Sequence, residues 1–390
     1  DCAPLADTLR LNGYSTGQFG TCHEVPVWQT SPMGPFDQWP KSSGFEHFYG
    51  YIGGETNQYE PTLYRDTVPV EPDRRPEEGY HLTEDMTDRS IAWAKQQKAL
   101  MPDKPFFMYF APGATHAPHH VPSEWSDKYR GRFDAGWDAL RDEIFARQKE
   151  LGVIGADAEL TARHDEIPAW DEMDDDLKPI LARQMEVYAG FMEHTDHHVG
   201  RLIDGLEELG VLDDTLIFCM IGDNGASAEG TLRGTFNEVL SLNGAAELET
   251  TEFMRGHIDE FGTPAAFNHY AVGWAHAMNT PYQWTKQVAS HWGGTRNGTI
   301  VHWPNGIDAA GETRHQFGHV IDIAPTILRA AGSPEPVTVH GFDQHPYEGF
   351  ALNDTFDDQD AAEVHETQYF EIVVNRGIYH KGWTAVTQHS

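Results

Sequence analysis

A carboxylate and a carboxamide stand side by side at Asp223 and Asn224. They directly follow the apolar run TLIFCMIG at residues 215–222, whose β-branched and aromatic composition predicts a buried strand. The carboxyl ends of such strands are where open α/β sheets bind their ligands. Carboxylate and carboxamide oxygens suit Ca²⁺ or Mg²⁺, so the pair is a candidate metal site. A plain turn is the alternative interpretation of the same residues.

An imidazole follows a second predicted strand in the same way. The run FFMYFA at 106–111 leads to His116, which lies between Pro112 and Pro118. A rigid loop that presents an imidazole suits a general acid, because proton donation needs fixed geometry and a pKa near neutrality. We expect the next two histidines, His119 and His120, to be solvated or to support His116.

The stretch GTCHEVP places Cys22 next to His23. A thiol beside an imidazole could be a nucleophile with its base or half of a metal site. Adjacent side chains in an extended chain usually point apart, which argues against a Cys22–His23 pair. His23 leaves the end of a short predicted strand, as His116 does.

A third group of polar residues surrounds paired glycines in HWGGTRN at 291–297, which follows Lys286 and precedes the predicted strand GTIVHW at 298–303. Paired glycines allow close backbone approach. Arg296 either holds this loop or touches a substrate. His197 and His198 lie within a long predicted helix, on different faces, and we interpret them as structural or exposed.

Composition limits the classes of partner. The chain has 390 residues, with 61 acidic against 27 basic side chains and a formal charge of -34. Such a charge repels nucleic acid, so an anionic substrate would need local positive charge; adaptation to a salty habitat is the alternative explanation. Three cysteines at wide spacings predict no disulfide framework. No apolar run approaches the ~20 residues of a membrane span.

Strands alternate with amphipathic helices, which predicts an α/β/α sandwich with a mostly parallel mixed sheet. Thr83 is the expected N-cap of a helix over 83–97, and Gly210 the left-handed cap after a helix over 179–209. Three further segments are predicted: a helical insertion at the sheet's edge (123–178), a long loop near the site (226–283), and a small C-terminal antiparallel part with a hairpin turn at Asn375–Arg376–Gly377. We place the domain boundary between 1–335 and 336–390.

The ordered series of His23, His116 and Asp223–Asn224 resembles the sulfatases of the alkaline phosphatase superfamily. GDNGA, GGTRN and HVIDIAPTILRAAG (319–332) resemble family motifs, and residues 129–152 and 185–217 resemble the larger bacterial arylsulfatases. The resemblance implies an alkaline phosphatase-like fold and hydrolysis of small-molecule or carbohydrate sulfate esters. Family members use a formylglycine nucleophile, made from the cysteine of Cys-x-Pro/Ala-Ser/Thr-Arg, with Ca²⁺ or Mg²⁺.

The resemblance also implies roles for individual residues. Asp223 and Asn224 would be metal ligands, and His116 would protonate the leaving oxygen and bind sulfate. His23 would take the proton from the remaining hydroxyl when the covalent sulfate leaves. Lys286 or His291 would contact the sulfate.

The chain departs from the family pattern in two places. It contains no complete nucleophile motif: CAPLA at 2–6 lacks the arginine, so we interpret Cys2 as a decoy. The nucleophile and a metal-binding Asp-Asp pair belong N-terminal to residue 1 in the family layout, so we expect a fragment without sulfatase turnover. Thr21 stands where the family has a lysine, a loss of charge that typically costs ~10²–10³ in rate.

Two other functions remain open from the sequence. The first is a phosphatase or phosphodiesterase on the same fold, and the second is a catalytically inactive sulfatase-like domain. No signal peptide is visible, and the compartment, periplasmic or cytoplasmic, stays unknown. So do the oligomeric state and the particular sulfate ester.

Overall fold

The computed structural model describes residues 2–387, which divide into two compact units. The first comprises the chain up to Gly113 together with Thr195–Ile217 and Val301–Glu366. The second comprises Ala114–His194, Phe218–Ile300 and the chain from Thr367 onward. The sequence-based boundary at residue 335 stays a prediction.

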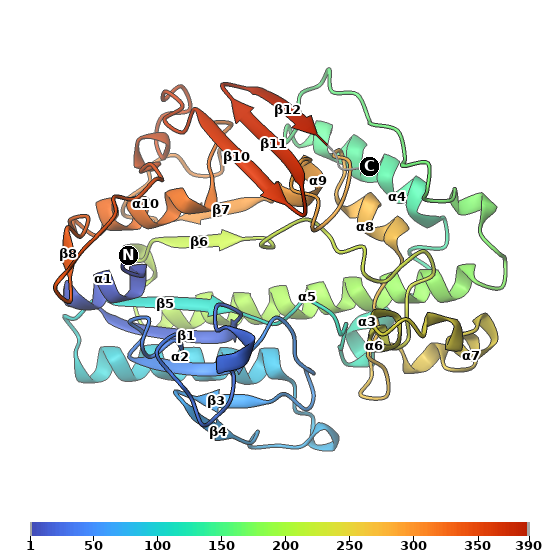
Figure 1. The fold of residues 1–390 in the computed structure, drawn as a ribbon, viewed down its shortest axis with the longest axis horizontal. Helices are drawn as coiled ribbons and strands as arrows, with labels where there is room; N and C mark the ends of the chain where they lie inside the picture. Colours follow the sequence, from blue (N-terminus) through green and yellow to red (C-terminus); the bar gives the residue numbers. More distant parts are fainter. Residues whose placement is uncertain (1, 388–390) are drawn as a thin grey trace. The chain divides into compact units, whose positions relative to one another are not determined.

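The first unit is built on a mixed five-stranded sheet, in the order β4-β3-β2-β1-β5 (Figure 1). Parallel pairs join β1 to β2 and β5, and antiparallel pairs join β3 to β2 and β4. The predicted α/β class with a mixed sheet is therefore confirmed. The strands are β1 (Ser15–Cys22), β2 (His47–Ile52), β3 (Leu63–Arg65), β4 (Val68–Val70) and β5 (Phe106–Ala111).

Helix α2 (Leu82–Leu100) packs on β1 and β2, as α1 (Leu5–Leu11) packs on β1. Phe19, Met86 and Trp93 are buried together in the core between sheet and helix. The helix over 83–97 is confirmed, but its predicted cap is wrong: the backbone N–H of Thr83 donates to Nδ1 of His81 at 3.3 Å, so His81 is the N-cap. An imidazole took the place of a hydroxyl as the capping acceptor.

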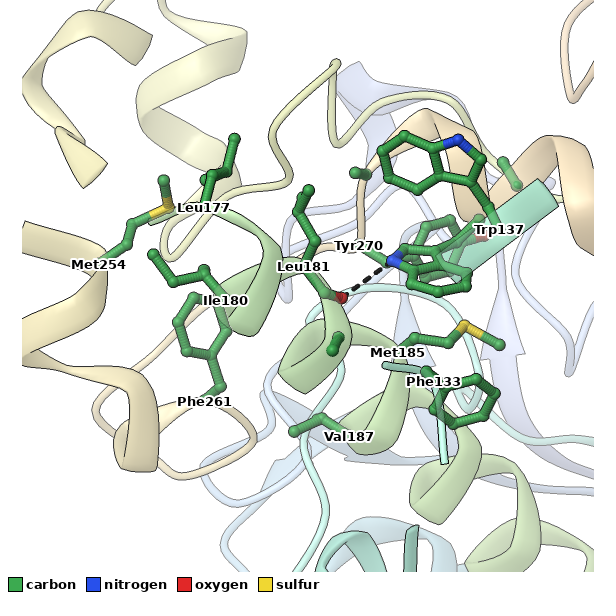
Figure 2. Close-up of a cluster of buried hydrophobic side chains, with 14 of the residues drawn as sticks. Phe133, Trp137, Leu177, Ile180, Leu181, Met185, Val187, Met254, Phe261 and Tyr270 are labelled. Atoms are coloured by element: carbon green, nitrogen blue, oxygen red, sulfur yellow. Dashed lines mark hydrogen bonds between the residues drawn. The ribbon is translucent and has the colours of Figure 1, made fainter. Parts of the chain in front are cut away.

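Helix α5 (Lys178–Glu208) confirms the long helix over 179–209, and Gly210 follows it at φ +66°, as its left-handed cap requires. Its first half carries the core of the second unit. Figure 2 shows Ile180, Leu181 and Met185 of this helix among buried aromatic rings. The dashed line there is the bond from the Trp274 indole N–H to the Leu181 carbonyl, 2.9 Å long.

The segment predicted as a helical insertion and the segment predicted as a long loop both prove to be parts of this core. Residues 123–178 contain α3 (Ser123–Ser126) and α4 (Gly136–Glu150), and Trp137 of α4 is only 2% exposed. Residues 226–283 are not a long loop: they hold α6 (Glu238–Leu242), α7 (Thr251–Gly256) and α8 (Val272–Met278). These helices are too short to show a period, and single aromatic side chains such as Trp274 anchor them instead.

The remaining elements are smaller. Strands β6 (Ile217–Met220) and β7 (Thr299–His302) confirm the two other predicted strands and pair with each other. Helices α9 (Trp292–Thr295) and α10 (Ile323–Ala330) and the short pair β8 (Thr338–Val339) and β9 (Phe342–Asp343) complete the series. Among the described residues, no helix is both long and apolar enough to cross a bilayer.

The C-terminal antiparallel sheet is confirmed, with strands β10 (Thr367–Ile372), β11 (Asn375–His380) and β12 (Trp383–Thr387). Its first turn differs from the prediction. Asn375 pairs with Ile372 and so begins β11, which leaves Val373 and Val374 as a two-residue turn with φ +48° and +59°. Positive φ at both positions is the type I′ pattern, which valine adopts only under strain.

Replacing this turn by Val373→Asn with Val374→Gly should relieve the strain. We expect the free energy of unfolding to rise by about 1–3 kcal/mol, measured by urea denaturation. Val337→Asn, at a valine that is 79% exposed outside the hairpin, serves as the control and should change little. An unchanged or lowered stability of the double variant would contradict the turn assignment.

Candidate active site

In the first unit, His23 is exposed at the end of β1 and its ring lies against Gly54. A Cβ at Gly54 would lie 2.7 Å from Cε1 of the imidazole, so glycine is required for this approach. Thr21 fixes the same loop, because its hydroxyl donates to the Gly53 carbonyl at 2.8 Å. Thr21 therefore has a structural task beside His23.

Cys22 is buried and turned toward Glu24, whose carboxylate accepts its S–H at 3.0 Å. Burial raises the pKa of this thiol strongly, and the hydrogen bond to Glu24 raises it further. A protonated thiol is neither a nucleophile nor a metal ligand. The structure thus agrees with the sequence argument against a Cys22–His23 pair.

In the second unit, His116 follows β5 and is half-buried. Its Nδ1 lies 2.8 Å from the Ala117 carbonyl oxygen, which can only accept, so Nδ1 carries the proton of the neutral ring. Nε2 lies 3.3 Å from Nζ of Lys286 and accepts from that ammonium. The ring is thereby held in one orientation, with Nε2 directed toward a cation.

Lys286 is fixed at both ends. Its backbone N–H donates to the Ala226 carbonyl at 3.0 Å, and its side chain, 22% exposed, reaches Oε2 of Glu229 at 3.1 Å as well as His116. The lysine therefore lies between an imidazole and a carboxylate. The sequence indicated Lys286 but gave no signal for Glu229, which is one acid among 61 and lies in the segment predicted as a loop.

Glu229 is itself held by hydrogen bonds. The Ser227 hydroxyl donates to Oε2 at 2.8 Å, and the Gln287 amide donates to Oε1 at 3.1 Å. Burial raises the pKa of this carboxyl, but the hydrogen bonds from Ser227 and Lys286 and the nearby positive charge outweigh burial, and the net pKa is lowered. Glu229 is therefore ionised at neutral pH.

The glycines near Asp223 and Asn224 explain how this loop is held. Gly225 donates from its backbone to the Gly294 carbonyl at 3.0 Å, and a Cβ at Gly225 would lie 1.6 Å from the Gly293 carbonyl oxygen. Only glycine permits that approach. The loop after β6 thus packs on the paired glycines at α9, with Asp223 exposed and Asn224 half-buried.

The oxygen donors of Asp223 and Asn224 suit a hard cation, but they form only part of a site. Ca²⁺ takes roughly six to eight oxygen ligands. Within residues 2–387, no group of three or more His, Cys, Asp or Glu side chains could hold a metal ion. Among the described residues, Asp223 and Asn224 therefore supply only part of the oxygen ligands that such a cation needs.

His291 precedes α9, and its Nδ1 lies 2.8 Å from the Ser290 hydroxyl. Burial lowers the pKa of His291, which favours the neutral ring. Lys286, by contrast, brings a positive charge into contact with His116. Of the two candidates for an anion contact, Lys286 is better suited because its side chain carries the positive charge.

Of the two alternatives expected for His119 and His120, solvation is wrong. Both are buried: His119 stacks on Tyr270, with ring centroids 4.9 Å apart, and His120 contacts the Ala266 carbonyl at 2.6 Å. Burial lowers the pKa of His120 and of neighbouring His269 to about 4, and it lowers the pKa of His119 well below its usual range. His119, His120 and His269 thus form a buried layer of rings near His116 that are uncharged at neutral pH.

His197 is exposed and His198 buried, which agrees with a structural role. Arg201 donates to Nδ1 of His198 at 3.0 Å, and burial, with the Arg201 charge, lowers the pKa of His198 to about 4. Arg296 lies over the Tyr282 ring at 5.4 Å, an interaction that holds the loop.

The model of the Sulfatase family matches residues 1–333. The chain belongs to the sulfatase family. It is 30% identical over 351 residues to an uncharacterised sulfatase of Schizosaccharomyces pombe, covering 86% of this chain and 59% of that protein. It is 28% identical over 337 residues to an arylsulfatase of Klebsiella aerogenes, covering 84% and 67%. The chain thus spans about three-fifths to two-thirds of these sulfatases.

Solved structures share the fold of this sulfatase chain. The structure of Ps i-CgsB in complex with k-i-k-neocarrahexaose matches with a TM-score of 0.58 and 18% identity, over 98% of this chain and 65% of that one. The structure of BT4656 in complex with its substrate D-glucosamine-2-N,6-O-disulfate matches with a TM-score of 0.55 and 17% identity, over 97% and 71%. The predicted alkaline phosphatase-like fold is confirmed.

The state of Cys22 can be tested by alkylation. Because burial and Glu24 keep its thiol protonated, iodoacetamide at pH 8 should modify exposed Cys2 at least about tenfold faster than Cys22, as peptide mass spectrometry would record. In urea the two rates should converge. Rapid modification of Cys22 in the folded protein would show a reactive thiolate and contradict this assignment.

Proposed function

We propose that this chain is the α/β part of a sulfuric ester hydrolase of the arylsulfatase type. Family membership and the likeness to an arylsulfatase support the reaction class. The observation that carries the proposal is the contact between the Lys286 ammonium and Nε2 of His116. It places a cation that can hold an anionic ester beside a ring nitrogen that can deliver a proton once it is protonated and no longer accepts from the lysine.

His116 would act as the general acid through Nε2. In its cationic form the ring donates Nδ1–H to the Ala117 carbonyl and Nε2–H to the ester oxygen. As the nucleophile forms a bond to sulfur and the bond from sulfur to the leaving oxygen breaks, the Nε2–H proton passes to that oxygen, and the ring returns to the neutral form with the proton on Nδ1. The Ala117 contact thus keeps one ring orientation throughout.

Lys286 would bind the sulfate, since its ammonium can donate to a sulfate oxygen while the backbone bond to Ala226 holds its loop. In a chain with a formal charge of -34, this local cation supplies the attraction that an anionic substrate needs. His291, whose ring pairs with Ser290, is the secondary candidate for this contact.

The remaining assignments concern the complete active site. We propose Asp223 and Asn224 as two of the ligands of Ca²⁺ or Mg²⁺, His23 as the base that assists release of the covalent sulfate, and a formylglycine nucleophile. Residues 1–390 contain no complete nucleophile motif, so this chain alone should lack turnover. A small-molecule or carbohydrate sulfate ester is the proposed substrate. The phosphatase alternative has no separate observation in its favour.

Anion binding tests the proposal without requiring turnover. Lys286→Met removes a charge-assisted hydrogen bond, so the Kd for phenyl sulfate, measured by isothermal titration calorimetry, should rise about 10- to 100-fold. Lys95→Met removes an equal charge at a side chain that is 51% exposed and should change the Kd less than about twofold. Equal binding by the Lys286 variant and the unmodified chain would overturn the assignment of the sulfate site.

A further inference from the structure

The carboxylate of Glu229 already contacts Lys286, the cation of the proposed sulfate site. Its Oε2 lies 3.1 Å from the Lys286 ammonium, the same group that contacts Nε2 of His116 at 3.3 Å. Any anion drawn to Lys286 therefore approaches a carboxylate as well as a cation. This carboxylate is not a fully solvated surface group, because its side chain is only 30% exposed.

The loop geometry fixes the carboxylate in place. Ser227 donates its hydroxyl to Oε2 at 2.8 Å and accepts from the Glu229 backbone N–H at 3.1 Å. The backbone N–H of Ser227 in turn donates to the Tyr270 hydroxyl at 3.2 Å, and Tyr270 is buried. Gln287, the neighbour of Lys286, donates to Oε1. A buried aromatic residue and the lysine loop thus hold the negative charge beside the positive one.

The charges of Lys286 and Glu229 offset each other, while the neutral form of His116 adds none. The effect on a ligand depends on the ligand's own charge. A sulfate monoester carries one negative charge, whereas a phosphate monoester at pH 8 carries about two, since its second pKa is about 6. Repulsion by a fixed carboxylate scales with the ligand charge and therefore acts about twice as strongly on the phosphate ester.

We propose that Glu229 is a specificity-determining residue whose carboxylate offsets the charge of Lys286, so that the site prefers monoanionic sulfate esters to dianionic phosphate esters. This inference rests on the proposed function, because it assigns the ligand of the Lys286–His116 site. It also gives the chain a physical means of disfavouring phosphate esters that does not depend on differences in ligand shape.

The test compares phenyl sulfate with phenyl phosphate at pH 8 on the 390-residue chain and on Glu229→Gln. Glutamine keeps the size of the side chain and an oxygen that accepts from Lys286, but it removes the charge. The preference for phenyl sulfate, taken as the ratio of the two Kd values, should fall by about three- to tenfold. Because both ligands bind the same folded molecules, a partial loss of folding leaves this ratio unchanged.

Two control variants separate charge from structure. Glu252→Gln removes an equal charge at an exposed site on α7 and should leave the ratio within about twofold. Glu229→Asp keeps the charge and should retain most of the preference. If Glu229→Asp loses as much preference as Glu229→Gln, the charge is not the cause and the inference fails.

The remaining outcomes distinguish this inference from the proposed function. If both ligands bind in a Lys286-dependent manner but Glu229→Gln leaves the ratio unchanged, the sulfate site stands and the role of Glu229 is overturned. If neither ligand binds in a Lys286-dependent manner, the proposed function fails, and the specificity role fails with it.

Discussion

The backbone contact between Gly225 and the Gly293–Gly294 pair is the constraint on which the candidate site in the second unit depends. It brings the loop after β6 within hydrogen-bond distance of the glycine pair at α9, at a separation that no side chain allows. Lys286 then donates its backbone N–H to Ala226, directly after Gly225. This one close approach therefore holds together the segments that carry Asp223, Asn224, Glu229 and Lys286. A Cβ at Gly225 would disturb all of them, although none of their side chains would have changed.

Burial of neutral rings decides where charge can exist in this site. His119 and His269 are nearly inaccessible to solvent, and burial lowers the pKa of both far enough to keep them uncharged at neutral pH. The layer near His116 supplies shape and rigidity without competing for an anion. The electrostatic character of the site then rests on the Lys286–Glu229 pair, which gives a single carboxylate more influence than it would have at an exposed surface.

The sequence predicts well those features that depend on local pattern. The strand at 106–111, the long helix before Gly210 and the polar residues at strand ends all follow from composition and period. Features that depend on tertiary contacts are missed. Trp274 anchors α8, a helix too short to show a period, and Glu229 matters only because folding brings Lys286 to it. Val373 and Val374 form a turn that no turn-residue rule would select, because strand register imposes it.

Thr21 shows why a departure from a family motif has to be explained by the surrounding structure. Compared with a lysine, its side chain lacks a positive charge, and the sequence alone presents this as a loss. In the fold, the Thr21 hydroxyl donates to Gly53, and the adjacent Gly54 leaves room for the His23 ring. A lysine at this position would forfeit that hydrogen bond, typically worth about 1 kcal/mol, and loosen the loop behind His23. The Thr21 hydroxyl therefore provides a contact within the loop next to His23, where a lysine would provide a positive charge.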